Sequence, residues 1–104
     1  MPLPFQDAAI DRLLGVMRRL RDRDGGCPWD VAQTFASIAP YTIEEAYEVA
    51  DAIASGDMSA LREELGDLLL QVVYHSQMAS EAGTFDFDTV AATIADKMIV
   101  RHPH

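Results

Sequence analysis

Residues 61–78, LREELGDLLLQVVYHSQM, decide the fold class of this chain. The apolar residues of the stretch cover more than one face of a helix: Leu61, Leu65, Leu68, Leu69, Leu70, Val72, Val73, Tyr74 and Met78. A helix that is apolar most of the way round needs neighbours on most of its sides. Four helices of one short chain supply only some of them. The sequence therefore predicts that a second copy supplies the rest, in a homodimer or larger homo-oligomer.

The rest of the sequence predicts further helices joined by short breaks. Apolar residues recur at helical spacing over 7–23, and similar segments follow at 43–55, 59–82 and 88–101. No segment alternates apolar and polar residues as a half-buried strand does. Residues 1–104 are therefore expected to form a single all-α domain, a four-helix-bundle-like unit completed by dimerisation.

Local signals predict where some of these helices begin. Asp30 is expected to cap a short helix that runs to about Ala39, and Pro40 favours a break after it. Thr42 and Glu45 have the spacing of a capping box, which predicts the start of the next long helix.

Composition narrows the class of protein. With 17 acidic and 8 basic residues the formal net charge is -9, and such a surface repels phosphate backbones, so nucleic-acid binding is not expected. Cys27 is the only cysteine, which excludes an intrachain disulfide and fits a reducing cytosol. The sequence shows no signal peptide and no membrane-spanning stretch. A cytoplasmic protein without a membrane partner is expected.

Residues 44–67 hold a local excess of negative charge. Only Arg62 offsets eight acids: Glu44, Glu45, Glu48, Asp51, Asp57, Glu63, Glu64 and Asp67. Glu45 and Glu48 are three residues apart, as are Glu64 and Asp67, so each pair shares one helix face. A short break joins the two helices, which are expected to pack antiparallel and to bring the pairs together.

Converging carboxylates repel one another unless cations lie among them. Hard oxygen ligands without a nearby cysteine favour Mg²⁺ or Mn²⁺ over zinc, and the absence of a Glu-x-x-His pair disfavours a di-iron site. Each pair alone has another interpretation, because acids suit a helix first turn and an exposed helix face. The two pairs together, one of them inside a leucine-rich run, favour a metal site.

The residues around these acids resemble a known family. EEAYE at 44–48 followed by ELGD at 64–67 is similar to the EExxE…ExxD signature of MazG-type pyrophosphohydrolases. GCPWD at 26–30 and RHPH at 101–104 match the same family pattern. The resemblance runs from about residue 10 to the last residue.

The resemblance implies a MazG domain that hydrolyses nucleoside triphosphates, NTPs and dNTPs, to the monophosphate and pyrophosphate, clearing unwanted nucleotides. It implies that Mg²⁺, or Mn²⁺ in its place, is bound by Glu45, Glu48, Glu64 and Asp67. The catalytic candidates are Glu44, Glu45 and Glu48, and the sequence leaves open which of them activates water.

Three further residues are candidates for holding the substrate. Lys97 and Arg101 share a helix face, and the resemblance implies phosphate contacts, although cations also suit a helix C-terminus. Trp29 could stack on a base or cover an edge of the core. The arginines from 12 to 23 are interpreted as a solvated face.

Gln71 and His75 lie on the same helix face as Glu64 and are candidates for the nucleotide pocket, although for His75 the sequence favours a buried, hydrogen-bonded histidine. Many family members continue with a second, similar domain. The chain could therefore be a catalytically weak nucleotide-binding, metal-binding and dimerisation module of a larger protein. A specialised phosphoribosyl substrate is disfavoured by the Cys27-Pro28-Trp29-Asp30 segment, and a purely structural bundle is the remaining alternative.

Overall fold

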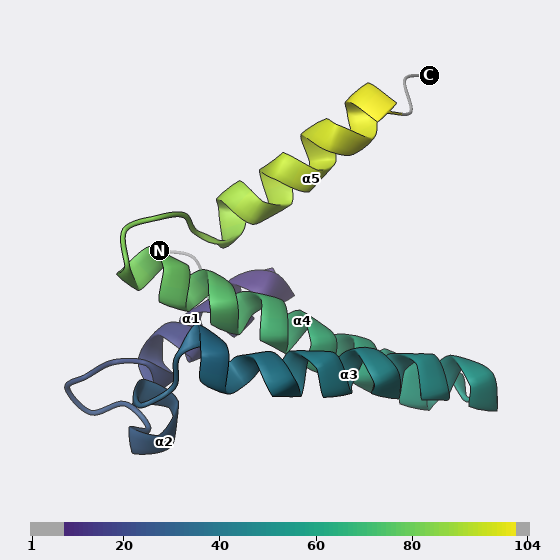
Figure 1. Ribbon diagram of the computed structural model, residues 1–104, viewed down its shortest axis with the longest axis horizontal. Helices are drawn as coiled ribbons and strands as arrows, with labels where there is room; N and C mark the ends of the chain where they lie inside the picture. Colours follow the sequence, from purple (N-terminus) through teal and green to yellow (C-terminus); the bar gives the residue numbers. More distant parts are fainter. Residues whose placement is uncertain (1–7, 102–104) are drawn as a thin grey trace.

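The computed structural model describes residues 8–101, which form four long helices and one single-turn helix (Figure 1). They are α1 (Ala9–Leu20), α2 (Pro28–Val31), α3 (Phe35–Ser55), α4 (Met58–Glu81) and α5 (Phe87–Arg101). No strand occurs among the described residues, so the all-α prediction is confirmed. No helix in this part of the chain has the length and hydropathy needed to cross a bilayer. The last three residues of the RHPH segment lie outside the described range.

The antiparallel pair α3 and α4 is the centre of the molecule (Figure 1). The turn between them needs Gly56, whose φ of 73° lies in the left-handed region that side chains disfavour. Asp57 then caps α4, since its carboxylate accepts hydrogen bonds from the backbone N–H groups of Ser59 at 2.9 Å and Ala60 at 3.1 Å. The predicted antiparallel packing of the two acid-bearing helices is confirmed.

The start of α3 differs from the prediction. Thr34 and Ser37 form the capping box: the Thr34 hydroxyl accepts from the Ser37 N–H, and the Ser37 hydroxyl accepts from the Thr34 N–H. The helix therefore begins at Phe35 and runs through Pro40, whose missing N–H costs one hydrogen bond to the first turn. The predicted break at Pro40 is wrong.

Two neighbouring predictions fail with it. Thr42 lies inside α3 rather than at its start, and its hydroxyl contacts side chains of α4 instead of capping a helix with Glu45. The predicted helix from Asp30 to Ala39 is also wrong. Asp30 belongs to the single turn α2, which begins after Cys27.

The core lies where α1 and α3 meet the C-terminal half of α4. Its buried members are Met17, Ile38, Val73, Tyr74 and Met78, with Ile10, Leu13, Leu14, Leu70 and Phe87 packed around them. The N-terminal half of α4 has no such cover. Leu65 is 47% exposed and Leu69 39%, while Ile43 and Tyr47 of α3 are 60% and 69% exposed. The apolar surface of α4 thus exceeds what the described helices bury, as the sequence indicates.

Helix α1 ends at Leu20, short of the predicted end at 23. Arg21, the next residue, holds the loop that follows. The Arg21 guanidinium donates to the backbone oxygens of Asp30 at 2.6 Å and Gln33 at 3.0 Å. It also forms a two-bond ion pair with Glu81 of α4, at 2.6 and 3.1 Å. The interpretation of all arginines from 12 to 23 as solvated is therefore wrong for Arg21, whose side chain is only 9% exposed.

Helix α5 leaves the bundle. Asp86 caps it by accepting a hydrogen bond from the Thr89 N–H at 2.9 Å. The helix contacts α4 near its own start and then projects away from the α3–α4 pair (Figure 1). Apolar residues along it are exposed: Ile94, Met98, Ile99 and Val100.

Candidate metal centre

Three carboxylates meet between α3 and α4. One oxygen each from Glu45, Glu64 and Asp67 lie within 4.8 Å of one another. Glu45 comes from α3 and the other two from α4, so the turn at Gly56 is what brings them together. Glu45 and Glu64 are half-buried, whereas Asp67 is exposed. We call these three side chains the carboxylate cluster.

Glu48 and Glu44 surround the carboxylate cluster without joining it. Glu48 is not among the three residues whose oxygens converge, but its charge raises the pKa of both Glu45 and Glu64. The charge of Glu44 also raises the pKa of Glu45. Of the four predicted metal ligands, the structure brings three together and places the fourth close enough to add to their field.

The electrostatics of the cluster suit a cation. The pKa of Glu45 is raised, first by desolvation and then by the charges of Asp67, Glu48 and Glu44. The pKa of Glu64 is raised by desolvation and then mainly by Glu45 and Asp67. No basic side chain among residues 8–101 forms an ion pair with the cluster. The negative charge there is uncompensated by the described part of the protein.

One atom gives a direct test of whether a metal fits. Glu45 Oε2 is buried and has no hydrogen-bond partner. A buried carboxylate oxygen without a partner is costly, since it has lost its water without replacement. A hard divalent cation held only by oxygens would satisfy that atom and relieve the repulsion among the acids. The residues present therefore fit Mg²⁺ or Mn²⁺.

A second polar group lies one helical turn away, also between α3 and α4. The Thr42 hydroxyl oxygen is 3.0 Å from Oε1 of Gln71 and 2.9 Å from Nε2 of His75. The Phe35 ring stacks on the His75 ring with centroids 5.9 Å apart and planes 10° apart. Burial lowers the pKa of His75, so the imidazole is neutral at neutral pH. We call Thr42, Gln71 and His75 the threonine triad.

Trp29 lies on the surface beside the start of α3. Its ring meets the Tyr41 ring edge to face at 6.2 Å and is 52% exposed, so it does not fill the core. The backbone on either side is held by Arg21 and by the Gln33 side chain, which donates to the Trp29 carbonyl oxygen. Its position is defined, and its ring remains available.

Lys97 and Arg101 are not brought to the carboxylate cluster in this chain. Both lie in the C-terminal half of α5, which points away from α3 and α4 (Figure 1). Lys97 lies along a groove with Phe85, Val90 and Ile94 instead.

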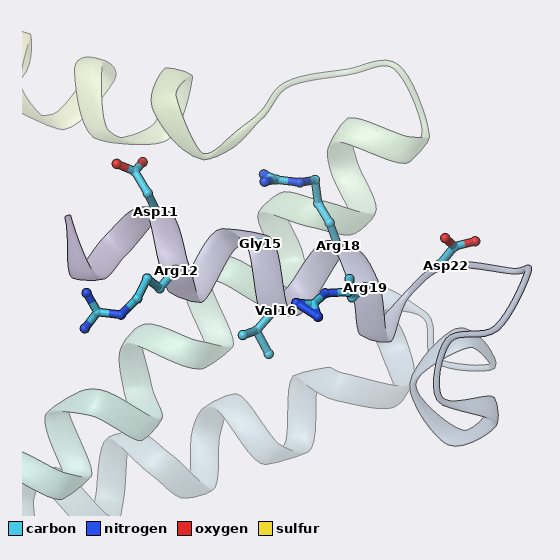
Figure 2. A pocket seen from close by; sticks show the side chains of 7 residues that line it. All are labelled: Asp11, Arg12, Gly15, Val16, Arg18, Arg19 and Asp22. Atoms are coloured by element: carbon cyan, nitrogen blue, oxygen red, sulfur yellow. The ribbon is translucent and has the colours of Figure 1, made fainter. Parts of the chain in front are cut away.

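The arginines on the surface of α1 do not converge on one point. A shallow hollow on the outer side of α1 is lined by Asp11, Arg12, Gly15, Val16, Arg18, Arg19 and Asp22. The three arginine side chains point in different directions rather than at one centre (Figure 2).

Sequence reasoning missed the part that Arg21 and Tyr74 play in shaping the site. The Tyr74 hydroxyl donates to Asp30, with Oδ1 at 2.9 Å and the backbone carbonyl oxygen at 3.1 Å. The Arg21 guanidinium lies 5.9 Å from the Tyr74 ring centre. A signal was present. Arg21 follows the buried Met17 by four residues, which places it on the inward face of the helix.

Comparison with known proteins agrees with the geometry. Residues 33–104 match the model of the MazG nucleotide pyrophosphohydrolase domain. A nucleoside triphosphate pyrophosphohydrolase of Escherichia coli (strain K12) is 64% identical over 95 residues, 91% of this chain and 36% of that protein. The nucleoside triphosphate pyrophosphohydrolase/pyrophosphatase MazG of Thermotoga maritima is 47% identical over 95 residues, 91% of this chain and 37% of its own length. This chain thus spans about a third of the length of these curated relatives.

Proposed function

This chain belongs to the MazG nucleotide pyrophosphohydrolase family, and from that premise we propose that it hydrolyses nucleoside triphosphates between the α and β phosphates with Mg²⁺. The products are a nucleoside monophosphate and pyrophosphate. The relatives' printed names support this reaction, and the two acid-bearing motifs of the family are complete. We extend the proposal to both NTPs and dNTPs, in clearing nucleotides from the cytoplasm.

The observation that carries the proposal is the carboxylate cluster with its unpartnered Glu45 oxygen. Glu45, Glu64 and Asp67 would hold the metal, with Glu48 as the fourth ligand. Bound Mg²⁺, or Mn²⁺ in its place, supplies charge neutralisation for the phosphates and orients them for in-line attack.

The remaining chemistry is done by the chain's own side chains. The attacking water must lose a proton, and a carboxylate outside full metal coordination can accept it. Glu44, Glu45 and Glu48 are the candidates, and Glu44 is exposed beside the cluster. The Trp29 ring is 52% exposed and contacts Tyr41, which precedes Glu45 by four residues on α3, and we propose that it stacks on the nucleoside.

We further propose that the active form is a homodimer or larger homo-oligomer. The exposed apolar side chains of α3 and of the first half of α4 support this, because contiguous apolar surface of this kind marks interfaces. Lys97 and Arg101 lie in the half of α5 that points away from α3 and α4 in one chain, so they would contact phosphates only in the assembled form. Light scattering on the purified chain tests the assembly.

The separation of Lys97 and Arg101 from the acids favours one alternative. The chain could be a nucleotide-binding, metal-binding and dimerisation module of a larger protein, with weak turnover of its own. The relatives are about three times longer, which leaves room for a second active unit.

Pyrophosphate release from NTPs and dNTPs, with and without Mg²⁺, separates the two. Release that requires Mg²⁺ and leaves the monophosphate supports the enzyme, and Asp67→Asn should reduce it at least a hundredfold. Asp51→Asn is the matched control, because Asp51 is an exposed acid on α3 outside the cluster.

Metal binding gives a second readout, because a ligand that binds the folded state raises the melting temperature. Mg²⁺ should raise it in the wild type and in Asp51→Asn but not in Asp67→Asn. A folded chain that responds to Mg²⁺ and releases no pyrophosphate would support the module instead.

A further inference from the structure

The threonine triad is a coupled set of donors and acceptors. A hydroxyl has one proton to donate, and the Thr42 hydroxyl has three possible acceptors. The Ile38 carbonyl oxygen is the most distant at 3.5 Å, so the proton goes to Gln71 or to His75. The hydroxyl oxygen then accepts a hydrogen bond from the other of the two.

This choice determines whether the remaining polar atom of Gln71 and that of His75 donate or accept a hydrogen bond. We call these two atoms, which do not bond Thr42, the outward groups. If Thr42 donates to the Gln71 oxygen, it accepts from Nε2–H of His75, which leaves the Gln71 NH₂ as a donor and His75 Nδ1 as an acceptor. If Thr42 donates to a bare His75 Nε2, it accepts from the Gln71 NH₂. Gln71 then presents its oxygen as an acceptor, and His75 presents Nδ1–H as a donor. The two outward groups always have opposite polarity, and both can reverse together.

The outward groups are available for a ligand. The only side-chain hydrogen bonds of Gln71 and His75 to described residues are those to Thr42. Both side chains are half-buried. A half-buried polar group without a hydrogen-bond partner contributes binding free energy when a ligand supplies that partner.

Their position matches the length of a nucleotide. Gln71 follows Asp67 by four residues and His75 follows it by eight, which is about 6 and 12 Å along α4. A nucleotide whose phosphates lie at the carboxylate cluster would reach this turn of α4 with its base. The Phe35 ring, 48% exposed and stacked on His75, adds an aromatic wall there.

We propose that Gln71 and His75 form a base-reading subsite in which the Thr42 hydroxyl couples their polarities. This rests on the proposed function, since the carboxylate cluster must hold the phosphates. All four common bases present adjacent groups of opposite polarity on their Watson–Crick edge: an acceptor beside a donor in uracil and guanine, and a donor beside an acceptor in cytosine and adenine. A pair that reverses as a unit accepts every one of them, and it excludes bases whose edge groups are both donors or both acceptors.

The test measures binding of UMP, CMP, GMP and AMP by calorimetry in the presence of Mg²⁺, and it needs no turnover because monophosphates are products of the proposed reaction. Wild type should bind UMP and CMP with affinities within about threefold of each other, and likewise GMP and AMP. Gln71→Glu replaces a reversible group by one that only accepts, so Thr42 must donate to it and accept from Nε2–H of His75, and both outward groups become acceptors. Only guanine among the four bases presents two adjacent donors, N1–H and N2–H₂, so the GMP to AMP ratio should rise at least tenfold while the UMP to CMP ratio stays within about threefold of its wild-type value.

Three controls keep the result specific. The added charge of Gln71→Glu weakens binding of all monophosphates alike and cancels in each ratio. Gln71→Met removes the hydrogen bond without fixing a polarity, so affinities should fall while the ratios stay near the wild-type values. Thr42→Val should weaken all four, and Thr42→Ser, which keeps the hydroxyl, should restore them.

A GMP to AMP ratio that rises less than tenfold in folded Gln71→Glu, or a UMP to CMP ratio that changes by as much, overturns the subsite. Absence of saturable binding of any monophosphate to the wild type overturns it as well, even if that protein releases pyrophosphate. If the GMP to AMP ratio rises as expected in a chain that shows no hydrolysis, the subsite stands and the proposed reaction fails.

Discussion

Replacing Arg21 by methionine keeps the aliphatic part of the side chain and removes the guanidinium. The change deletes the hydrogen bonds to the backbone oxygens of Asp30 and Gln33 and both bonds to Glu81. It also removes the cation that lies 5.9 Å from the Tyr74 ring centre. The loop that carries Trp29 then loses its charged donor and keeps its backbone hydrogen bonds and the Gln33, Tyr74 and Tyr41 contacts.

The expected loss of unfolding free energy follows from these contacts. Two partly buried carbonyl oxygens left without a charged donor cost about 1–2 kcal/mol each. The Glu81 side chain is 35% exposed, so its ion pair contributes about 1 kcal/mol or less. We expect Arg21→Met to lower the unfolding free energy by about 3–4 kcal/mol, a large part of the 5–15 kcal/mol typical of a domain.

Urea unfolding followed by circular dichroism measures this loss. Arg18→Met is the matched control, because Arg18 is an exposed arginine of α1, the helix that ends just before Arg21 (Figure 2), and it should change stability by less than about 0.5 kcal/mol. Trp29 fluorescence gives a local readout of the loop. If Arg21→Met costs no more than Arg18→Met, the hydrogen bonds of Arg21 do not hold the loop, and this reasoning is refuted.

Three other predictions concern single residues. Arg21 holds the pKa of Glu81 below its ordinary 4.5, so the stability that Glu81 adds is present above pH 4.5 and is lost as pH falls through the lowered pKa. The difference in unfolding free energy between wild type and Glu81→Gln should therefore close on acidification. Burial lowers the pKa of His75, so on acidification this imidazole takes up a proton in the unfolded chain before it does so in the folded one. The midpoint of urea unfolding should therefore fall as pH drops below 6.5 in the wild type. This contribution should be missing from His75→Gln. Gly66 lies within α4, and an alanine methyl group there would meet no described atom within 4 Å outside its own helix backbone and chain neighbours. Gly66→Ala should therefore stabilise the chain by about 0.5–1 kcal/mol in thermal melts. A loss of stability would show that this helix face is occupied.

The second acid-bearing helix could be predicted closely because its signals are local. Asp57 supplies a cap at its start, and the leucine-rich run makes its length clear. The start of α3 could not be predicted in the same way. Thr42 and Glu45 have the letters of a capping box, and choosing Thr34 with Ser37 instead requires knowing that Ile38 enters the core.

The site was predictable to the extent that helix spacing determines it. Periodicity placed Glu64 and Asp67 on one face, and the short turn brought Glu45 against them. The direction of α5 depends on contacts far from its own sequence, so the distance of Lys97 from the acids had no local signal. The link from Thr42 to Gln71 likewise joins residues 29 apart.

The ion pair of Arg21 and Glu81 joins residues 60 positions apart, whereas α3 and α4 are joined by a turn of two residues. Closing a long loop costs more chain entropy than closing a short one, so the α3–α4 pair should assemble first and α1 should dock onto it late. Contacts that form after the rate-limiting step slow unfolding and leave the folding rate almost unchanged. Arg21 therefore acts as a kinetic latch, which sets how long the loop bearing Trp29 stays closed once the chain has folded.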